Sequence, residues 1–185
     1  MRNVILSAAI SFDGFIEGPN GEIDWITFGD EDGASDLMEL VGAIDAVLYG
    51  RVSYEMWGNP EITEKSSDFE KNFYGSITKM DRYVFSTTKT EFEGNPIVVK
   101  DGAAELINDL KSQPGKNIWL YGGASLVTTF MNLDLVDEFW LGVMPVILGQ
   151  GKPLIQNVEQ RHKLKLKQST ASKSGAIGVR YETIR

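Results

Sequence analysis

The chain has no cysteine and a single histidine among its 185 residues. Without thiols it cannot form disulfides, use a cysteine nucleophile or bind zinc through cysteine. His162 lies in a basic run with Arg161 and Lys163, a composition typical of an exposed surface. One histidine cannot build a multi-histidine metal centre, so we expect no metal site.

Basic residues are also scarce, with 18 Lys and Arg against 26 Asp and Glu and a formal net charge of −8. This balance argues against a general nucleic-acid binder, whose affinity depends on neutralising phosphates. No apolar run is long enough to span a bilayer, and the strand-like start at 4–10 lacks the features of a secretory signal. We expect a cytoplasmic protein with one domain over residues 1–185 and no membrane or nucleic-acid partner.

Short apolar runs alternate with helical patterns until about residue 131. The runs that predict strands in this part are 4–11, 46–49, 83–85, 97–99 and 118–121. Three further strand-like runs, 138–148, 163–170 and 177–184, follow without an intervening helix. The pattern predicts an α/β fold with a mostly parallel central sheet, helices on both faces and antiparallel C-terminal strands.

Two glycine turns stand where a buried strand gives way to a helix. Gly50 follows the run 46–49 and precedes Arg51 and Ser53, and Gly122-Gly123 follow the run 118–121. A helix that begins after glycine leaves backbone N–H groups free to bind phosphate. A single such glycine is more often a plain turn, but two turns with Arg51 and Ser53 beside one of them indicate a nucleotide site.

Five short motifs occur in an order that resembles the dihydrofolate reductase fold, and most closely the reductase domain of the riboflavin pathway. They are SFDGFI at 11–16, GRVSYE at 50–55, YGGASL at 121–126, LVDE at 135–138 and PVILGQGKPL at 145–154. The resemblance implies a three-layer α/β/α fold, NADPH as the hydride donor and a cis peptide between the two glycines of the second turn.

The resemblance also implies which residues contact the cofactor. They are Ala9, Ile16, Gly50, Arg51, Ser53, Ser86, Thr87, Gly122, Gly123, Ala124, Ser125 and Leu126. The first two would line the nicotinamide, Ser86 and Thr87 would lie near the adenosine ribose, and the second glycine turn would hold the pyrophosphate. The chain departs from related reductases at Thr87, where a basic residue often serves the 2′-phosphate. The preference for NADPH therefore depends on Arg51, helped by Lys89.

The proton donor and the substrate contacts are less specific. Asp36 is the carboxylate closest in position to the acid of dihydrofolate reductases, although it also fits a solvated residue in the first turn of a helix. The residues predicted to contact the substrate are Asp13, Trp25, Leu37, Trp57 and Tyr121. For three of them a structural role is an alternative. Asp13 could instead close a turn through its own backbone. Trp25 could instead pack on the core, and Trp57 could cover a helix end.

These features predict an NADPH-dependent oxidoreductase that transfers a hydride to a planar nitrogen heterocycle. The C-terminal motif favours 5-amino-6-(5-phosphoribosylamino)uracil as the substrate. The alternatives are a pterin reductase and a non-catalytic nucleotide-binding module of the same fold. The run 138–148 is apolar on both faces in a part of the chain that is poor in helices, which predicts that a second subunit covers it in a homodimer.

Overall fold

The computed structural model describes residues 1–26 and 31–185. Its main sheet has the strand order β5-β4-β3-β6-β1-β7-β10-β9. The bounds of these strands are Val4–Ser11 (β1), Ile44–Gly50 (β3), Asp81–Phe85 (β4), Ile97–Val99 (β5), Asn117–Gly122 (β6), Glu138–Met144 (β7), Lys163–Ala171 (β9) and Ile177–Ile184 (β10). All neighbouring pairs from β5 to β7 are parallel, whereas β10 runs antiparallel to both β7 and β9.

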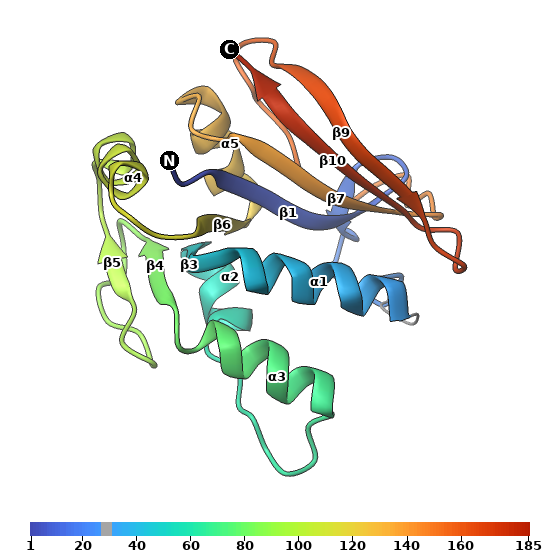
Figure 1. The fold of residues 1–185 in the computed structure, drawn as a ribbon, viewed down its shortest axis with the longest axis horizontal. Helices are drawn as coiled ribbons and strands as arrows, with labels where there is room; N and C mark the ends of the chain where they lie inside the picture. The colour runs from blue at the N-terminus through green and yellow to red at the C-terminus, as the bar shows by residue number, and fades with distance from the viewer. Residues whose placement is uncertain (27–30) are drawn as a thin grey trace.

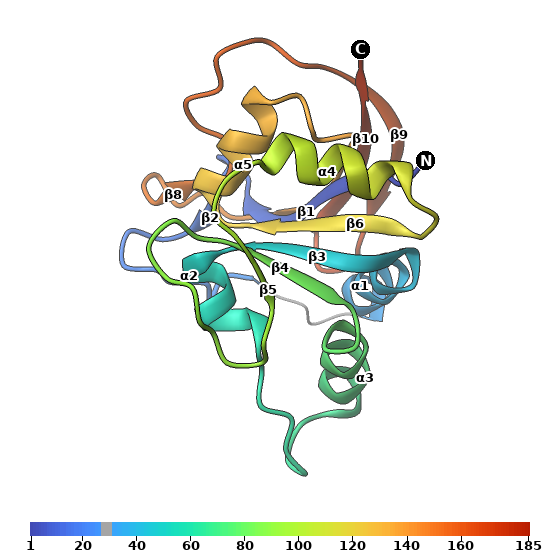
Figure 2. The same cartoon turned by 90° about the vertical axis from the view of Figure 1, so that its left-hand side faces the viewer.

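Helices cover both faces of this sheet, which confirms the predicted three-layer architecture (Figures 1 and 2). Helices α1 (Glu31–Ala43) and α3 (Asp68–Ile77) lie on one face. Helices α4 (Ala103–Ser112) and α5 (Ala124–Asn132) lie on the other. A short α2 (Arg51–Ser53) continues directly into a π-helical turn, η1 (Tyr54–Gly58). A small second sheet pairs β2 (Phe15–Glu17) with β8 (Lys152–Pro153).

The sheet separates two apolar clusters, one under each helical layer. Ile44 and Phe73 belong to the cluster on the α1 and α3 side, and Ile107 and Phe130 to the cluster on the α4 and α5 side. Strand residues alternate between the two clusters, because successive side chains of a strand point to opposite faces. No helix in the described ranges has the length and hydropathy needed to cross a bilayer.

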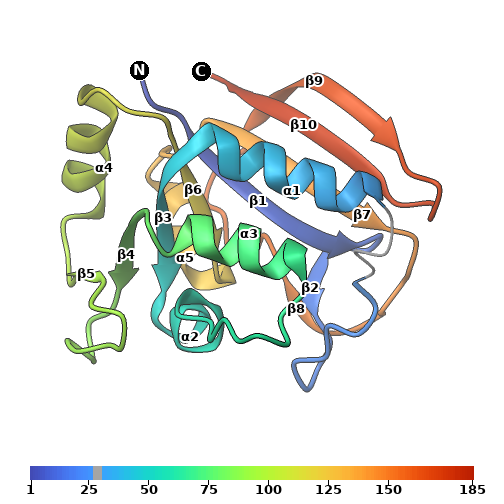
Figure 3. The ribbon, with the colours of Figure 1, turned by 60° about the horizontal axis from the view of Figure 1, so that its bottom comes forward.

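The strand predicted at 138–148 is shorter in the structure. β7 ends at Met144 and the chain turns at Pro145, because proline has no N–H to donate to a neighbouring strand. β7 is also not left at an edge of the sheet. It lies between β1 and β10, and Figure 3 shows α1 lying across this part of the sheet.

The carboxylate of Asp137 ties the start of β1 to α4 and to the C-terminal region. It accepts a hydrogen bond from the Val4 backbone N–H at 2.7 Å, and it pairs with Lys111 at 2.6 Å and Arg185 at 2.7 Å. The side chains of Lys111 and Asp137 are only 11% and 13% exposed. Removing the carboxylate would therefore leave a largely buried ammonium group without its partner.

We predict that Asp137→Ala lowers the free energy of unfolding by about 3 kcal/mol. The matched control is Asp134→Asn, which alters a carboxylate that also pairs with Arg185 but is far more exposed. Its effect should stay within about 1 kcal/mol. Urea denaturation followed by circular dichroism measures both. Equal losses for the two variants would contradict the role given to the buried pair.

Candidate active site

A cavity of about 1310 Å³ opens where the parallel strands of the main sheet end. The cavity is lined by residues at or near the carboxyl ends of five parallel strands. These residues are Ala9 of β1, Gly50 of β3, Ser86 after β4, Lys100 after β5 and Gly123 after β6. Ligands of α/β sheets generally bind at this carboxyl edge. Pockets for one small molecule usually enclose about 300–1,000 Å³, so this cavity has room for a dinucleotide and a second, smaller ligand.

The two predicted glycine turns contact each other in this cavity. A Cβ atom built on Gly50 would lie 3.4 Å from the backbone nitrogen of Gly123, and one built on Gly123 would lie 3.1 Å from Ser53 Oγ. Gly122 has a φ of +101°, in the region that favours glycine. The peptide bond between Gly122 and Gly123 is cis, which confirms that expectation. Because both turns consist of glycine at these positions, the space between them stays open; a side chain at Gly50 or Gly123 would occupy it.

Helix α5 begins directly at the second turn. Gly123 is its N-cap residue and offers no side chain to accept the first N–H groups of the helix. These N–H groups, at Ala124 and Ser125 among others, therefore remain available to a ligand, and the helix dipole favours a negative one.

Arg51 lies at the first turn in a short chain of surface charges. Its Nη1 lies 2.7 Å from Glu55 Oε2, and Lys89 Nζ lies 2.8 Å from Glu55 Oε1. Hydrogen bonds from Lys89 and Arg51 lower the pKa of Glu55. The two cations thus share one carboxylate, and this group of three has a net positive charge next to Ser86, whose Oγ accepts the Lys89 backbone N–H at 2.9 Å.

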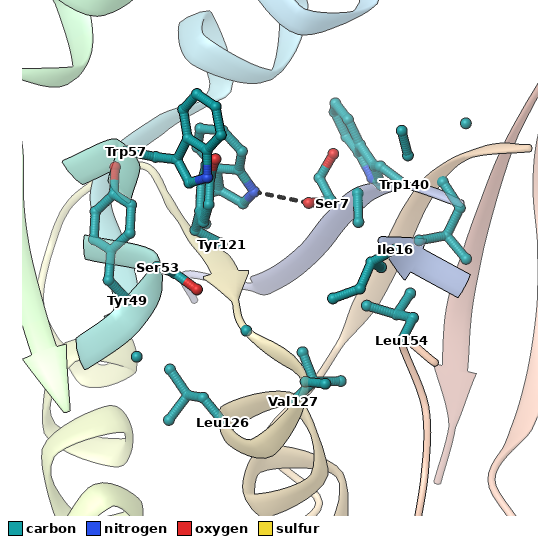
Figure 4. A pocket seen from close by; sticks show the side chains of 18 of the residues that line it. Ser7, Ile16, Tyr49, Ser53, Trp57, Tyr121, Leu126, Val127, Trp140 and Leu154 are labelled. Atoms are coloured by element: carbon teal, nitrogen blue, oxygen red, sulfur yellow. Dashed lines mark hydrogen bonds between the residues drawn. The ribbon is translucent and has the colours of Figure 1, made fainter. Parts of the chain in front are cut away.

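Aromatic side chains form the wall of the cavity on the α1 and α3 side. The rings that line it are Tyr49, Trp57, Phe69, Phe73, Tyr74, Trp119, Tyr121 and Trp140. Tyr121 packs on two of them, with ring centroids 4.9 Å from Tyr49 and 5.0 Å from Trp119. The indole N–H of Trp119 donates to the Ser7 carbonyl oxygen at 3.2 Å (Figure 4). Such a wall suits a flat ring that stacks on it.

Most of the predicted site residues line this one cavity. Those on the cofactor side are Ala9, Ile16, Gly50, Arg51, Ser53, Ser86, Thr87, Gly123, Ala124, Ser125 and Leu126. Those predicted for the substrate or for catalysis are Asp36, Leu37, Trp57 and Tyr121. Gly122 is not among the residues that line the cavity, although it precedes Gly123 in the same turn. Their shared position agrees with one ligand site, while the role of each residue stays a prediction.

Two predicted substrate residues do not reach the cavity. Asp13 accepts hydrogen bonds from Ser11 Oγ at 2.7 Å and from the backbone N–H groups of Leu148 and Gly149 at 3.1 and 2.7 Å. Its carboxylate therefore joins two loops, in agreement with the alternative of a turn-closing residue. The indole N–H of Trp25 donates to the Glu22 carbonyl oxygen at 3.0 Å within its own loop.

The structure adds charged residues that the sequence patterns did not indicate. Arg180 of β10 lines the cavity and pairs with Asp36 and Glu39 of α1. Lys152 of β8 lines it as well and lies 3.0 Å from Glu17 of β2. These partners are separated by more than 130 residues, so no periodic pattern relates them. Lys152 belongs to the sequence motif at 145–154, but that motif did not predict that its side chain lines the cavity.

The parallel sheet, the paired glycine turns and the order of the elements define a dihydrofolate reductase-like α/β protein. The chain belongs to the RibD C-terminal domain family, whose model matches residues 2–177. It is 44% identical over 180 residues to the uncharacterized protein YyaP of Bacillus subtilis, covering 97% of this chain and 94% of that protein. It is 31% identical to the uncharacterized protein YwjB of the same organism, covering 90% of each chain.

Solved structures share the fold at lower identity. A putative riboflavin biosynthesis protein from Shewanella superposes with a TM-score of 0.76 at 24% identity, covering 99% of both chains. A diaminohydroxyphosphoribosylaminopyrimidine deaminase/5-amino-6-(5-phosphoribosylamino)uracil reductase from Thermotoga maritima superposes with a TM-score of 0.70 at 18% identity. This chain covers 57% of that bifunctional protein.

Proposed function

We propose that the protein is an NADPH-dependent reductase that transfers a hydride to a planar nitrogen heterocycle. The observation that carries the proposal is the direct contact of the two glycine turns, with Arg51 and Ser53 beside them, in the cavity that also holds the aromatic wall. A phosphate-binding edge next to a stacking surface suits a nicotinamide dinucleotide and an acceptor ring. Membership of the RibD C-terminal domain family supports the same reaction class.

Each part of the cavity has a role in this proposal. The backbone N–H groups at the start of α5 bind the pyrophosphate, and Arg51 binds the 2′-phosphate. Ala9 and Ile16 pack against the nicotinamide, and Tyr121 lies beside the acceptor ring. When bound, the cofactor supplies the hydride, and the protein supplies orientation and electrostatics.

Oxidation of NADPH tests the proposal. Purified protein, NADPH and either an aminouracil or a dihydropterin are mixed, and loss of the reduced nicotinamide absorbance is followed. The name of the Thermotoga relative supports the phosphoribosylated aminouracil as one substrate, and a pterin is the other candidate. A protein that binds NADPH but oxidises it with neither ring would instead be the non-catalytic nucleotide-binding module.

We propose Asp36 as the proton donor, because its side chain lines the cavity, whereas Glu39, the other acidic side chain described in α1, does not. Asp36→Asn should lower kcat about a hundredfold, while the NADPH dissociation constant stays unchanged. Glu39→Gln is the matched control, since Glu39 pairs with the same Arg180 but does not line the cavity. Equal effects of the two variants on kcat would show that both act only through Arg180.

We also propose a homodimer that forms through the C-terminal strands. Phe139, Tyr181 and Leu166 lie opposite one another across β7, β10 and β9, so they share one face of the sheet. Phe139 is buried in the core, but every residue of β9 is exposed, so Leu166 and Leu164 form an apolar surface on the outer part of this face. A second copy of the chain is the simplest cover for it.

Light scattering at micromolar concentration should give the mass of a dimer, and Leu166→Glu should give that of a monomer. Lys165→Gln, a change on the opposite face of β9, should leave the dimer intact. A monomeric mass for the unaltered protein would contradict the proposal.

A further inference from the structure

We infer that the substrate is an uncharged planar ring that carries hydrogen-bond acceptors and no phosphate group. The inference rests on the proposed reductase function and names the substrate class for the same cavity. It separates the two candidate substrates, because the aminouracil of the Thermotoga relative carries a phosphoribosyl group whereas a pterin does not.

The positive charges of the cavity are divided between its two sides. Among the described residues its lining cations are Arg51, Lys100, Lys152 and Arg180. Arg51 and Lys100 stand at the ends of β3 and β5, on the side of the glycine turns that we assign to the cofactor. A cationic contact to a phosphate on the substrate would therefore have to come from Lys152 or Arg180.

Both of these remaining cations already have carboxylate partners. Lys152 Nζ lies 3.0 Å from Glu17 Oε1. The two terminal nitrogens of Arg180 each donate to one oxygen of Glu39 at 2.6 Å, and one of them also reaches Asp36 at 3.3 Å. A bidentate carboxylate uses the same planar fork that would bind a phosphate.

The surroundings of Arg180 hold this arrangement in place. Its side chain is 15% exposed, and its guanidinium stacks over the Trp140 ring at 4.0 Å from the centroid. Hydrogen bonding to Arg180 lowers the pKa of Glu39, which therefore stays ionised at neutral pH. The Arg180–Glu39 pair has no net charge, so a phosphate dianion placed here would lose its hydration without gaining an unpaired cation.

The same side of the cavity offers neutral donors. Tyr49, Tyr74 and Tyr121 line it, and none of the three hydroxyl groups has a hydrogen-bond partner in the described part of the chain. Burial raises the pKa of Tyr49 and Tyr121, so both hydroxyls keep their protons. Hydroxyl donors beside stacked rings match the carbonyl oxygens and ring nitrogens of a flat heterocycle.

A matched pair of probes tests the inference. They are 5-amino-6-ribosylaminouracil and its 5′-phosphate, which differ only in the phosphate. Binding of each to the protein saturated with NADP⁺ is measured by quenching of tryptophan fluorescence, since Trp57 and Trp140 line the cavity. We expect the unphosphorylated ring to bind about tenfold more tightly. Equal or tighter binding of the phosphate, or no binding of the unphosphorylated ring, would overturn the inference.

Two variants test the cause of the preference. Glu39→Gln should strengthen binding of the phosphorylated probe about threefold or more and leave the other probe unchanged, because it frees the fork of Arg180. Glu182→Gln is the control, because it also removes one negative charge, two residues after Arg180 on β10. Glu182 pairs with Lys165 and Lys167, and none of these three residues lines the cavity, so the variant should change neither affinity. Identical effects of both variants would overturn the role given to Glu39.

Turnover separates this inference from the proposed function. NADPH oxidation with the phosphorylated probe in preference to the other would refute the substrate class and leave the reductase intact. Tight binding of the unphosphorylated probe without NADPH oxidation would support the class and refute the reductase.

Discussion

Replacing Arg51 with alanine is expected to weaken NADPH binding about ten- to a hundredfold and to change NADH binding little. The two cofactors differ by the 2′-phosphate, and Arg51 is the guanidinium at the first glycine turn. A lost charge-assisted contact to phosphate costs roughly 1.5–3 kcal/mol. Arg51 is 42% exposed and shares Glu55 with Lys89, so its other N–H groups are accessible to a ligand.

Dissociation constants for both cofactors, measured by fluorescence titration, test this expectation. Arg51→Lys keeps the charge without the planar fork, so it should recover only part of the affinity. Glu55→Gln is the complementary variant, because it removes the carboxylate shared by Arg51 and Lys89 and should favour NADPH further. Equal losses of NADPH and NADH in Arg51→Ala would show that Arg51 does not read the 2′-phosphate.

Replacing Gly123 with alanine is expected to lower the affinity for either cofactor at least tenfold, equivalent to about 1.4 kcal/mol. The added methyl group would lie 3.1 Å from Ser53 Oγ, in the space between the two turns that we assign to phosphate. Gly123 has a φ of −81°, which alanine adopts readily, so the fold should persist.

Thermal melting and cofactor titration of the same sample separate a folding defect from a binding defect. Gly75→Ala is the control, because a Cβ on this α3 glycine would meet no atom within 4 Å. It should leave cofactor affinity unchanged. An unchanged NADPH dissociation constant in Gly123→Ala would remove the second turn from the proposed site.

Local signals in the sequence predicted the layers and the glycine turns correctly. The glycines could be recognised because each directly follows the apolar run that forms its strand, at Gly50 and at Gly122. The end of β7 was predicted too late, since the apolar pattern continues past Pro145 although the strand cannot. Tyr49 of β3 was missed, because only the pairing of β3 with β6 brings its ring together with that of Tyr121.

The contacts made by charged side chains could not be predicted in this way. Arg180 and Glu39 lie 141 residues apart, and Asp13 lies 136 residues from Gly149, to whose backbone it bonds. Each pair forms only once the sheet has assembled. The sequence therefore predicted a substrate contact or a turn for Asp13 but not its bond to Gly149, and it did not single out Arg180.

The place of β10 in the sheet has a consequence for the synthesis of the protein. Residues 177–184 form an inner strand between β7 and β9, although they follow both in the chain. A nascent chain can fold its glycine turns before then, but β7 lacks its second neighbour and α1 lacks Arg180 until this segment has left the ribosome. The wall of the cavity on the substrate side is thus completed last, by contacts between distant parts of the chain that form slowly. With the roles proposed above for the two sides of the cavity, the cofactor side would form before the substrate side during synthesis.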